Sequence, residues 1–445
     1  MSTPQVQREI ARFVSRTPGS RALQQEAARY LPGGSSRTTA YFEPYPIFVD
    51  RGEGHYVYDV DGNRYLDFML NATSLILGHA HPAIVGALQE QASRGTAFSA
   101  PTEAQIRLAR LLCERLPSLD TVRFTNSGTE ATLMALRAAR AFTRKPKIAK
   151  FEGGYHGSHE YVSVSVRPPA ARLDPAGPTA LPEYPGQPPG VIAEVLVLPY
   201  NDLPRCARLL RQHREELACV LVEPVASAFG YLPARREFLV GLRELTAELG
   251  LLLIFDEVQS VRLAPGGAQE VLGVVPDLTC LGKTIGGGMP VGAFGGRAEV
   301  MALFDPTRGA PLAHAGTFNA NPMTMVAGEA TLRCLTPEVY ARLGALGESL
   351  RQQLRALFAR LQVPAQVTGI GSFFGIHFTA EAIVDYRSVL RGDRTLAQGL
   401  FVGLINEGIL LQSSCAGALC TLTTAAEVEA LVAAVERVMR RLRSP

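Results

Sequence analysis

The 445-residue sequence lacks several features that mark membrane, secreted and nucleic-acid-binding proteins. No apolar run approaches the roughly 18 residues that a transmembrane helix requires. The N-terminal stretch lacks the apolar segment of a secretory signal, so a cytoplasmic location is expected. The net charge of +3 is small and the Lys and Arg residues are dispersed, which disfavours a nucleic-acid surface. Small molecules are therefore the expected partners.

The cysteines do not indicate a disulfide framework. The seven of them are scattered along the chain and never form a CxxC pair. An odd, dispersed set of this kind is typical of reduced thiols in a reducing compartment. We therefore expect no disulfide scaffold.

What the sequence does contain is a regular alternation of short apolar segments and helical patterns. This alternation is typical of an α/β domain around a mostly parallel sheet. The expected strands are residues 121–126, 147–151, 194–199, 218–224 and 251–257. Between the last two strands, residues 236–249 place apolar side chains on one helical face.

The C-terminal part is richer in helical patterns than the middle of the chain. Its last helix is expected to begin at a capping box formed by Thr424 and Glu427. Residues 326–445 are interpreted as a second, smaller domain. Residues 168–189 contain eight prolines, which exclude regular secondary structure and indicate a long surface loop.

The strongest local motif is PDLTCLGKTIGGGMPVGAFGG (276–296), in which Lys283 follows a buried strand-like run. Three consecutive glycines come after it and permit a close backbone approach that side chains would prevent. Taken alone, a lysine beside glycines is more often a solvated loop residue. Residues near Lys283 in the fold must decide whether it is such a loop residue or part of a ligand site.

Asp256 ends the apolar strand LLLIFDE, at the edge of an α/β sheet where ligands bind. A carboxylate that emerges from apolar residues needs a partner, because an unpaired buried charge is costly. One interpretation is a structural ion pair, or a metal ligand together with Glu257. The other is an acid that keeps a pyridine nitrogen protonated, so that a cofactor ring can act as an electron sink.

A third motif, FTNSGTEATLMALRAARAF (124–142), turns from a strand into a long helix. Ser127 and Glu130 have the spacing of a capping box. The amides of Gly128 and Thr129 lie at the helix N-terminus, where anions bind. Helix starts far outnumber phosphate sites, so a capping motif alone does not predict one. The position of this helix start directly after a strand is what favours a phosphate site here.

The segment FEGGYHGSHE (151–160) places Tyr155 and His156 directly after another strand. An aromatic ring at this point is suited to stacking on a planar cofactor. A metal site at His156 and His159 is disfavoured, because no further Cys, His or carboxylate completes a recognisable ligand set. We therefore expect no metal, and a surface position for His159.

Five motifs, NSGTEA, KFEGGYHG, VEPV, FDEV and LGKTIGGGMPVGAFGG, occur here in the order seen in class III pyridoxal-phosphate aminotransferases. The resemblance covers about residues 30 to 440. Within that family the sequence resembles β-amino-acid (β-phenylalanine-type) aminotransferases and glutamate-1-semialdehyde 2,1-aminomutases. It implies the α/β fold of a fold-type I transferase, with a large domain on a mostly parallel, seven-stranded sheet and a smaller α+β domain.

The resemblance also implies pyridoxal 5′-phosphate as the cofactor and assigns residues to it. Lys283 would form the Schiff base, and Asp256 would pair with the pyridinium nitrogen. The further cofactor contacts would be Ser127, Gly128, Thr129, Tyr155, His156, Glu223, Val258 and Thr317. Tyr155 would stack on the ring, and Thr317 would reach the phosphate of a neighbouring subunit, which implies a homodimer with shared active sites.

The same resemblance refines the domain division. Residues 1–50 would join the C-terminal residues 326–445 in the small domain. Residues 51–325 would then form the large cofactor-binding domain.

For the substrate, the resemblance points to Arg37 and Ala72. Arg37 stands where β-amino-acid aminotransferases carry a carboxylate-binding Arg, although an Arg after a Gly-Ser turn is as often a solvated loop residue. Ala72 replaces a Trp expected in the aminomutases, and Ser414 stands where a second carboxylate-binding Arg would be expected. We therefore predict a transaminase that moves an amino group between a carboxylate-bearing amine, such as a β-amino acid, and a keto acid or aldehyde.

Two other functions were compared with this prediction. A glutamate-1-semialdehyde 2,1-aminomutase is the alternative, because the motifs at 276–296 and 183–203 fit it nearly as well. A regulator that only senses pyridoxal phosphate is disfavoured, because no nucleic-acid-binding module flanks the enzyme-like core.

Overall fold

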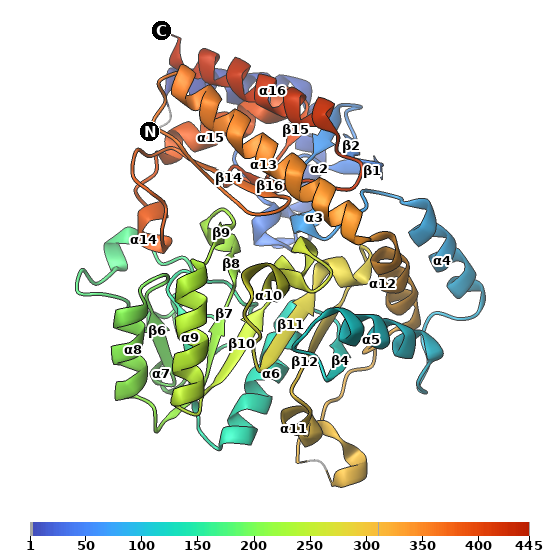
Figure 1. Cartoon of the computed structure of the whole chain (residues 1–445). Helices are drawn as coiled ribbons and strands as arrows, with labels where there is room; N and C mark the ends of the chain where they lie inside the picture. The colour runs from blue at the N-terminus through green and yellow to red at the C-terminus, as the bar shows by residue number, and fades with distance from the viewer. Residues whose placement is uncertain (1–2, 310, 445) are drawn as a thin grey trace. The chain divides into compact units, whose positions relative to one another are not determined.

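The computed structural model describes residues 3–309 and 311–444, and these form two compact units (Figure 1). Unit 1 comprises the chain through His81, Arg342–Ala382, and the chain from Arg391 onward. Unit 2 comprises Pro82–Ala341 and Ile383–Leu390. The division of the chain into domains at residues 1–50, 51–325 and 326–445 stays a prediction.

Unit 2 is built on one large sheet with the strand order β4-β12-β11-β10-β7-β5-β6. The strands are β4 (Thr121–Thr125), β12 (Gly292–Gly296), β11 (Leu278–Gly282), β10 (Leu252–Asp256), β7 (Leu217–Val222), β5 (Lys147–Phe151) and β6 (Val195–Leu198). Strand β12 runs antiparallel to both of its neighbours, and the remaining pairs are parallel. Within the described residues this is a mostly parallel, seven-stranded sheet, which confirms the predicted fold class.

The five strands expected from the sequence are all present, as β4, β5, β6, β7 and β10. Each observed strand begins within one residue of its predicted start and ends within two residues of its predicted end. Helix 236–249 is observed as α9 (Arg236–Glu248). Buried β-branched and aliphatic runs between turn residues were sufficient to locate these elements.

The other helices of unit 2 are α4 (Pro82–Ser93), α5 (Glu103–Arg115), α6 (Gly128–Thr143), α7 (Pro189–Ala193), α8 (Leu203–Gln212), α10 (Gly267–Leu272), α11 (Ala298–Met301), α12 (Pro322–Cys334) and α14 (Tyr386–Val389). Helix α6 packs across β4, β7, β10, β11 and β12 through a buried face rich in alanine. Helices α8 and α9 contact each other and pack on β6 and β10, and Figure 1 shows them side by side in front of the sheet. A short hairpin, β8 (Val225–Ala226) with β9 (Leu232–Pro233), follows β7.

The proline-rich segment 168–189 behaves as predicted. Its backbone holds one 3-10 turn, Ala170–Arg172, and one isolated bridge between Val164 and Pro182. Helix α7 begins at Pro189, the position in a helix that proline tolerates best because its N–H would have no intrahelical partner.

Unit 1 contains two small sheets, with the strand orders β1-β2-β3-β15 and β13-β14-β16. Their strands are β1 (Val49–Glu53), β2 (Tyr56–Asp59), β3 (Arg64–Asp67), β15 (Ile409–Leu410), β13 (Gln366–Thr368), β14 (Phe373–His377) and β16 (Ala416–Ala418). The helices are α1 (Pro4–Arg16), α2 (Pro18–Ala27), α3 (Leu70–Thr73), α15 (Arg394–Asn406), α16 (Ala425–Arg443) and α13 (Pro337–Arg360), which enters unit 1 at Arg342. The predicted capping box of the last helix is present, because Thr424 and Glu427 exchange side-chain and backbone bonds.

The N-terminal helix is tied to the C-terminal one by charge. Arg441 of α16 donates to Glu9 of α1 at 2.6 Å and to Glu407 at 2.7 Å. Glu9 is buried, so removal of Arg441 would leave a buried carboxylate without this cationic partner, which is costly.

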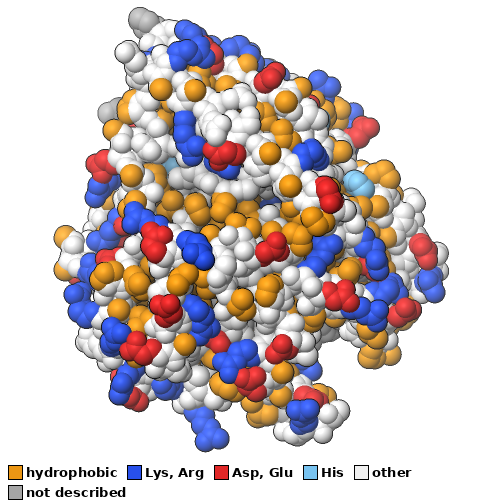
Figure 2. Space-filling model, viewed as in Figure 1, with side chains coloured by type: hydrophobic (Ala, Val, Ile, Leu, Met, Phe, Trp, Pro, Cys, Tyr) orange, Lys and Arg blue, Asp and Glu red, His pale blue; other side chains and the backbone are white. Residues whose placement is uncertain are grey.

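Two surface properties complete the description. On the face shown in Figure 2, Lys and Arg side chains are interspersed with Asp and Glu, as the small net charge suggests. Among the residues that the structure describes, no helix is both long and apolar enough to span a membrane.

Candidate active site

Five predicted site residues lie at one edge of the unit 2 sheet. Because β4, β5, β7, β10 and β11 run in the same direction, their carboxyl ends meet at this edge. Each of these strands ends at or shortly before one of Ser127, Tyr155, Glu223, Asp256 and Lys283. The antiparallel strand β12 begins at the same edge, where Gly292 lies opposite both Thr125 and Gly282.

The centre of this edge is a hydrogen bond between Asp256 and His156. The distance from His156 Nδ1 to Asp256 Oδ2 is 2.8 Å, and both side chains are buried. Asp256 Oδ1 accepts a second bond from the backbone N–H of Val258, at 3.1 Å. These two bonds use two of the about four acceptor positions of a carboxylate. Asp256 therefore keeps acceptor capacity for a protonated nitrogen of a ligand.

Glu223 lies beside this pair. Its Oε1 accepts from the hydroxyl of Ser227 at 2.6 Å, and its Oε2 accepts from the backbone N–H of Tyr155 at 3.4 Å. Burial raises the pKa of Glu223, the charge of Asp256 adds to this effect, and His156 opposes it. The two carboxylates thus share the buried end of the sheet, where the charge of His156 acts on Glu223 and its ring is bonded to Asp256.

Lys283 begins the 3-10 turn Lys283–Gly286 directly after β11. Its backbone has a φ of 51°, in the left-handed region that costs energy for a residue with a Cβ atom. Burial lowers the pKa of the Lys283 amine, and the charges of Asp256 and Glu223 act in the opposite direction. A lowered pKa increases the fraction of neutral amine, which is the nucleophilic form.

The whole chain contains only four lysines: Lys145, Lys147, Lys150 and Lys283. Lys145 donates to the carbonyl of Arg214, Lys147 pairs with Glu216, and Lys150 donates to three backbone carbonyls. Glu223 acts on the amines of both Lys150 and Lys283, and Asp256 acts on that of Lys283. The scarcity of lysine is a further sequence signal that strengthens the case for Lys283.

The start of α6 differs in one detail from the predicted capping box. The Ser127 hydroxyl accepts from the backbone N–H of Glu130 at 3.2 Å, as expected. The Glu130 carboxylate, however, accepts from the backbone N–H of Asn126 at 2.6 Å instead of that of Ser127. The prediction of a reciprocal box was therefore wrong by one residue, because the chain bends before Ser127 and turns the Asn126 amide toward Glu130.

Close packing at Gly128 brings two predicted cofactor residues together. A Cβ atom added at Gly128 would lie 3.0 Å from the Val258 side chain, so the absence of a side chain lets α6 begin next to β10. Helix α6 thus directs its first amides to the edge where Asp256 ends its strand.

Tyr155 and His159 occupy different environments in the loop after β5. The Tyr155 side chain is exposed, and the guanidinium carbon of Arg167 lies 5.9 Å from its ring centroid. His159 is half-buried and not a surface residue as predicted, since its Nε2 lies 3.4 Å from the hydroxyl of Thr132. Burial lowers the pKa of His159 to about 4.

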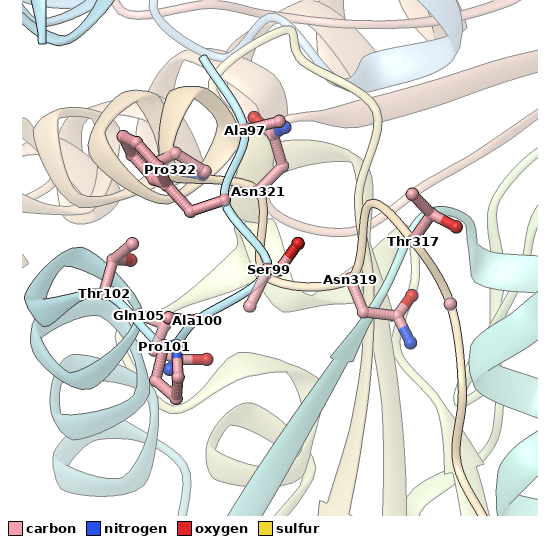
Figure 3. Close-up of a pocket in the computed structure, with 13 residues that line it drawn as sticks. Ala97, Ser99, Ala100, Pro101, Thr102, Gln105, Thr317, Asn319, Asn321 and Pro322 are labelled. Atoms are coloured by element: carbon pink, nitrogen blue, oxygen red, sulfur yellow. The ribbon is translucent and has the colours of Figure 1, made fainter. Parts of the chain in front are cut away.

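Thr317 lies in a pocket of about 590 Å³ (Figure 3). The pocket is lined by residues 97–102, Gln105, 316–317 and 319–322. Thr317 is exposed, and Figure 3 shows it on the loop that also carries Asn319. A bond of 2.9 Å between Asn319 and Asn126 connects this loop to the turn before α6. In the described chain, Lys283 and Asp256 are not among the residues that line this pocket.

In unit 1 the structure brings the two predicted substrate residues close to each other. Arg37 Nη1 donates to the Asn71 side-chain oxygen at 2.9 Å, and Ala72 follows Asn71. Arg37 is exposed, and this bond uses one of its five N–H donors.

The segment that carries Asn71 and Ala72 is a left-handed turn. The φ angles of residues 70–73 are 49°, 47°, 54° and 74°, although none of them is glycine. Left-handed backbone costs about 1–2 kcal/mol per residue with a Cβ atom. Asp67 stabilises the turn by accepting from the amides of Met69 and Leu70, each at 2.8 Å. Strain of this kind concentrates at functional sites.

Comparisons with known proteins agree with this geometry. Residues 39–433 match the family model for class-III aminotransferases. The chain is 44% identical to the β-phenylalanine transaminase of Variovorax paradoxus, over 95% of this chain and 93% of that protein. It is 43% identical to glutamate-1-semialdehyde 2,1-aminomutase 2 of Geobacillus kaustophilus, over 95% and 98% of the two chains. The crystal structure of an omega-transaminase from Sphaerobacter thermophilus is 48% identical, with a TM-score of 0.94, and covers 97% of this chain and 100% of its own.

The chain belongs to the class-III aminotransferase family. It is a pyridoxal-phosphate-dependent enzyme of the transaminase type, with the fold-type I architecture. The predicted family, fold, cofactor and enzyme class are therefore confirmed.

The residues at the sheet edge fit this cofactor in charge and shape. A lysine with a lowered pKa, a buried carboxylate with acceptor capacity, and a helix N-terminus for a phosphate lie at one edge. The close contact between Gly128 and Val258 shows that a side chain at position 128 would fill the space beside the helix start. All of these groups belong to unit 2.

Proposed function

We propose that this class-III aminotransferase moves an amino group from a carboxylate-bearing amine, in the first instance a β-amino acid, to a keto acid or aldehyde. Lys283 would hold pyridoxal phosphate covalently, and the first amides of α6 with Ser127 and Thr129 would hold its phosphate. When bound, the cofactor supplies an electron sink for the charge that forms at the substrate carbon. The observation that carries the proposal is Lys283 beside the buried Asp256–His156 pair.

Each residue at the sheet edge would have its own role in the reaction. Lys283 Nζ would take the proton from the substrate carbon that bears the amino group, which requires a neutral amine. Asp256 would keep the ring nitrogen protonated, and His156 would orient the Asp256 carboxylate through the 2.8 Å bond. Tyr155 would cover one face of the ring, and Glu223 would lie near its phenolic oxygen.

Arg37 supports a substrate with a carboxylate. An exposed guanidinium that makes one bond to Asn71 can still form a bidentate pair with a carboxylate. The relative that is named for β-phenylalanine supports the same substrate class. Ala72 would then contribute a small side chain where a bulky one would exclude an aryl group.

An aminomutase is a second candidate, because the Geobacillus relative with that name is nearly as similar to this chain. Such an enzyme moves an amino group within one molecule. It would need no separate acceptor, so turnover of a single substrate without a keto acid distinguishes the two functions.

We further propose that two copies of the chain form a homodimer in which Thr317 contacts the cofactor phosphate of the partner. The pocket around Thr317 and the exposed side chains of Phe98 and Phe318 support this, because large apolar groups on a surface are suited to an interface. Sedimentation analysis tests the state of assembly. A stable monomer that binds cofactor with full occupancy would contradict it.

The experiment that tests the proposed activity is a half-reaction screen. Purified holoenzyme is mixed with α-, β- and γ-amino acids and with simple amines, and the visible absorbance of the cofactor is followed. The fastest loss of absorbance is expected with β-amino acids, and addition of a keto acid should restore the spectrum. A response confined to amines without a carboxylate would contradict the proposed substrate class.

A further inference from the structure

A second lysine of unit 2 is buried more deeply than Lys283. Lys150 lies in β5, and its side chain is 0% exposed. Charged side chains are almost never fully buried unless they are paired. Lys150 Nζ donates to three backbone carbonyls, those of Gly154 at 3.0 Å, Val162 at 2.9 Å and Val164 at 2.6 Å.

Three acceptors around one nitrogen match the three N–H donors of an ammonium group. A neutral amine could satisfy only two of them, so these bonds favour the charged form. Burial acts in the opposite direction and lowers the pKa of Lys150 to about 7, while the charges of Glu223 and Glu183 raise it. Carbonyl acceptors carry no net charge, so these three hydrogen bonds are what compensates the cost of burying the amine.

The three carbonyls belong to the two ends of a single loop. Gly154 lies where the loop leaves β5, and its carbonyl belongs to the peptide bond that leads into Tyr155. Val162 and Val164 lie where the loop returns. The buried Lys150 side chain therefore connects the segment where the loop leaves β5 with the segment where it returns.

Other contacts show what the loop presents directly after Gly154. The Tyr155 amide contacts Glu223, and the His156 ring contacts Asp256. On the side of Gly153 the loop is closed by Tyr386, because a Cβ atom at Gly153 would lie 2.2 Å from the Tyr386 ring. Lys150 is thus the internal support of a loop that carries Tyr155 and His156, the residues proposed to contact the cofactor.

We propose that Lys150 is a positioning residue: its ammonium group holds the loop 152–165 so that Tyr155 and His156 are placed for the cofactor ring. This inference rests on the proposed roles of Tyr155 and His156. Lys150 contacts neither residue's side chain by hydrogen bond, and it acts through the backbone of Gly154.

The test compares three variants of the full chain. Lys150→Met removes the charge and keeps the length of the side chain, and Lys150→Arg keeps the charge. Lys147→Met is the matched control, because Lys147 lies on the same strand and pairs with Glu216 at a partly exposed position. Hydrogen exchange of peptides from 152–165, cofactor affinity by equilibrium dialysis, and the visible circular dichroism of the bound cofactor are measured for each.

For Lys150→Met we expect exchange in 152–165 to be faster by about tenfold or more, and cofactor affinity to fall by a similar factor, because a charge-assisted set of bonds is lost. The circular dichroism of the bound cofactor should shrink, and Lys150→Arg should recover part of each effect. Lys147→Met should behave like the unaltered protein.

Two results would overturn the proposal. One is exchange, cofactor affinity and dichroism in the Lys150 variants equal to those of Lys147→Met. The other is failure of both Lys150 variants to fold, which would make Lys150 a residue of the general core. If only Lys150→Met fails to fold, Lys150→Arg decides through the same three measurements.

The proposed function fails by a different result, namely a cofactor label on a lysine other than Lys283 in the unaltered protein. In that case hydrogen exchange still reports whether Lys150 supports the loop. The two failures are therefore distinguishable.

Discussion

The sheet edge of unit 2 differs from the Arg37 turn of unit 1, by which we mean Arg37 together with the left-handed turn 70–73 that it bonds, in how firmly the functional groups are held. At the sheet edge, Asp256, His156 and Glu223 are buried. Asp256 and His156 share a bond of 2.8 Å, and Glu223 accepts from the Ser227 hydroxyl at 2.6 Å. In unit 1, Arg37 is exposed and is held by one side-chain bond to Asn71, on a strained turn. Groups that stabilise charge during a reaction need fixed positions in a medium of low dielectric constant, whereas a group that selects substrates must open to solvent.

This difference leads to different expectations for mutants. Changes at the sheet edge should lower the rate for every substrate. Changes at the Arg37 turn should alter the apparent affinity for some substrates and leave others unaffected. The following predictions, in order of decreasing effect, test whether the two regions are separable in this way.

The largest effect is expected for Asp256→Asn. A neutral amide cannot keep a ring nitrogen protonated, so turnover should fall by about a hundredfold or more, equivalent to roughly 3 kcal/mol, for all substrates. The bound cofactor content should change little. Steady-state kinetics with amino acids and with plain amines measures this effect.

Asp277→Asn is the matched control for that variant. Asp277 is also a buried carboxylate, but it lies at the start of β11 and pairs with Arg243 and Arg297. Its loss should lower the melting temperature and leave turnover near the original value. Unchanged turnover in Asp256→Asn would show that Asp256 has only a structural role.

Arg37→Ala should raise KM for amino acids by roughly 10- to 100-fold, because a bidentate, charge-assisted pair contributes about 1.5–3 kcal/mol. Amines without a carboxylate should be converted as before. Arg21→Ala, at an exposed position in α2, serves as the control. Equal losses for amino acids and plain amines would mean that Arg37 supports the fold or the cofactor instead.

A smaller effect is expected for Asn71→Gly. Glycine tolerates the φ of 47° and removes the 2.9 Å bond to Arg37, so KM for amino acids should rise about fivefold while the melting temperature is maintained. Asn71→Ala should show the same rise in KM together with a lower melting temperature, because alanine is strained in this conformation. If neither variant changes KM, the Asn71 bond does not orient Arg37.

The smallest effect concerns His159 and stability. Burial lowers the pKa of this imidazole to about 4 from 6.5, so between these pH values the unfolded chain binds a proton that the folded chain does not. Stability should therefore rise with pH in this window, by at most about 1.4 kcal/mol per pH unit for one proton, and His159→Gln should flatten the rise. Urea unfolding at pH 4 to 7, with His213→Gln as control, measures it. A slope that is unchanged in His159→Gln would contradict the burial argument.

The sequence predicted the sheet edge better than the Arg37 turn for a physical reason. Strand ends are visible in a sequence because buried apolar runs stop at polar or glycine residues, and Asp256 and Lys283 stand at such points. Parallel strands then bring distant residues to one edge without further information. The capping box at Thr424 depends only on residues that are close in the sequence, so it was also predictable, and the structure confirms it.

Features that depend on packing were not predictable in this way. The left-handed turn at residues 70–73 contains no glycine, and the bonds that Asp67 accepts from the amides of Met69 and Leu70 join residues that no sequence motif links. The three carbonyls around Lys150 come from positions up to 14 residues away. Residues 383–390 belong to unit 2, although they lie between two C-terminal stretches of unit 1. The roles of Arg37, Ala72 and Thr317 and the cytoplasmic location stay predictions.

The central claim is that Lys283 binds the cofactor at the buried edge of unit 2. Borohydride reduction of the holoenzyme followed by peptide mapping tests it most directly, because the chain has only four lysines. We predict a single cofactor label, on the peptide that contains Lys283, and no label in the Lys283→Ala variant. A label on the peptide with Lys145, Lys147 or Lys150 would contradict the account.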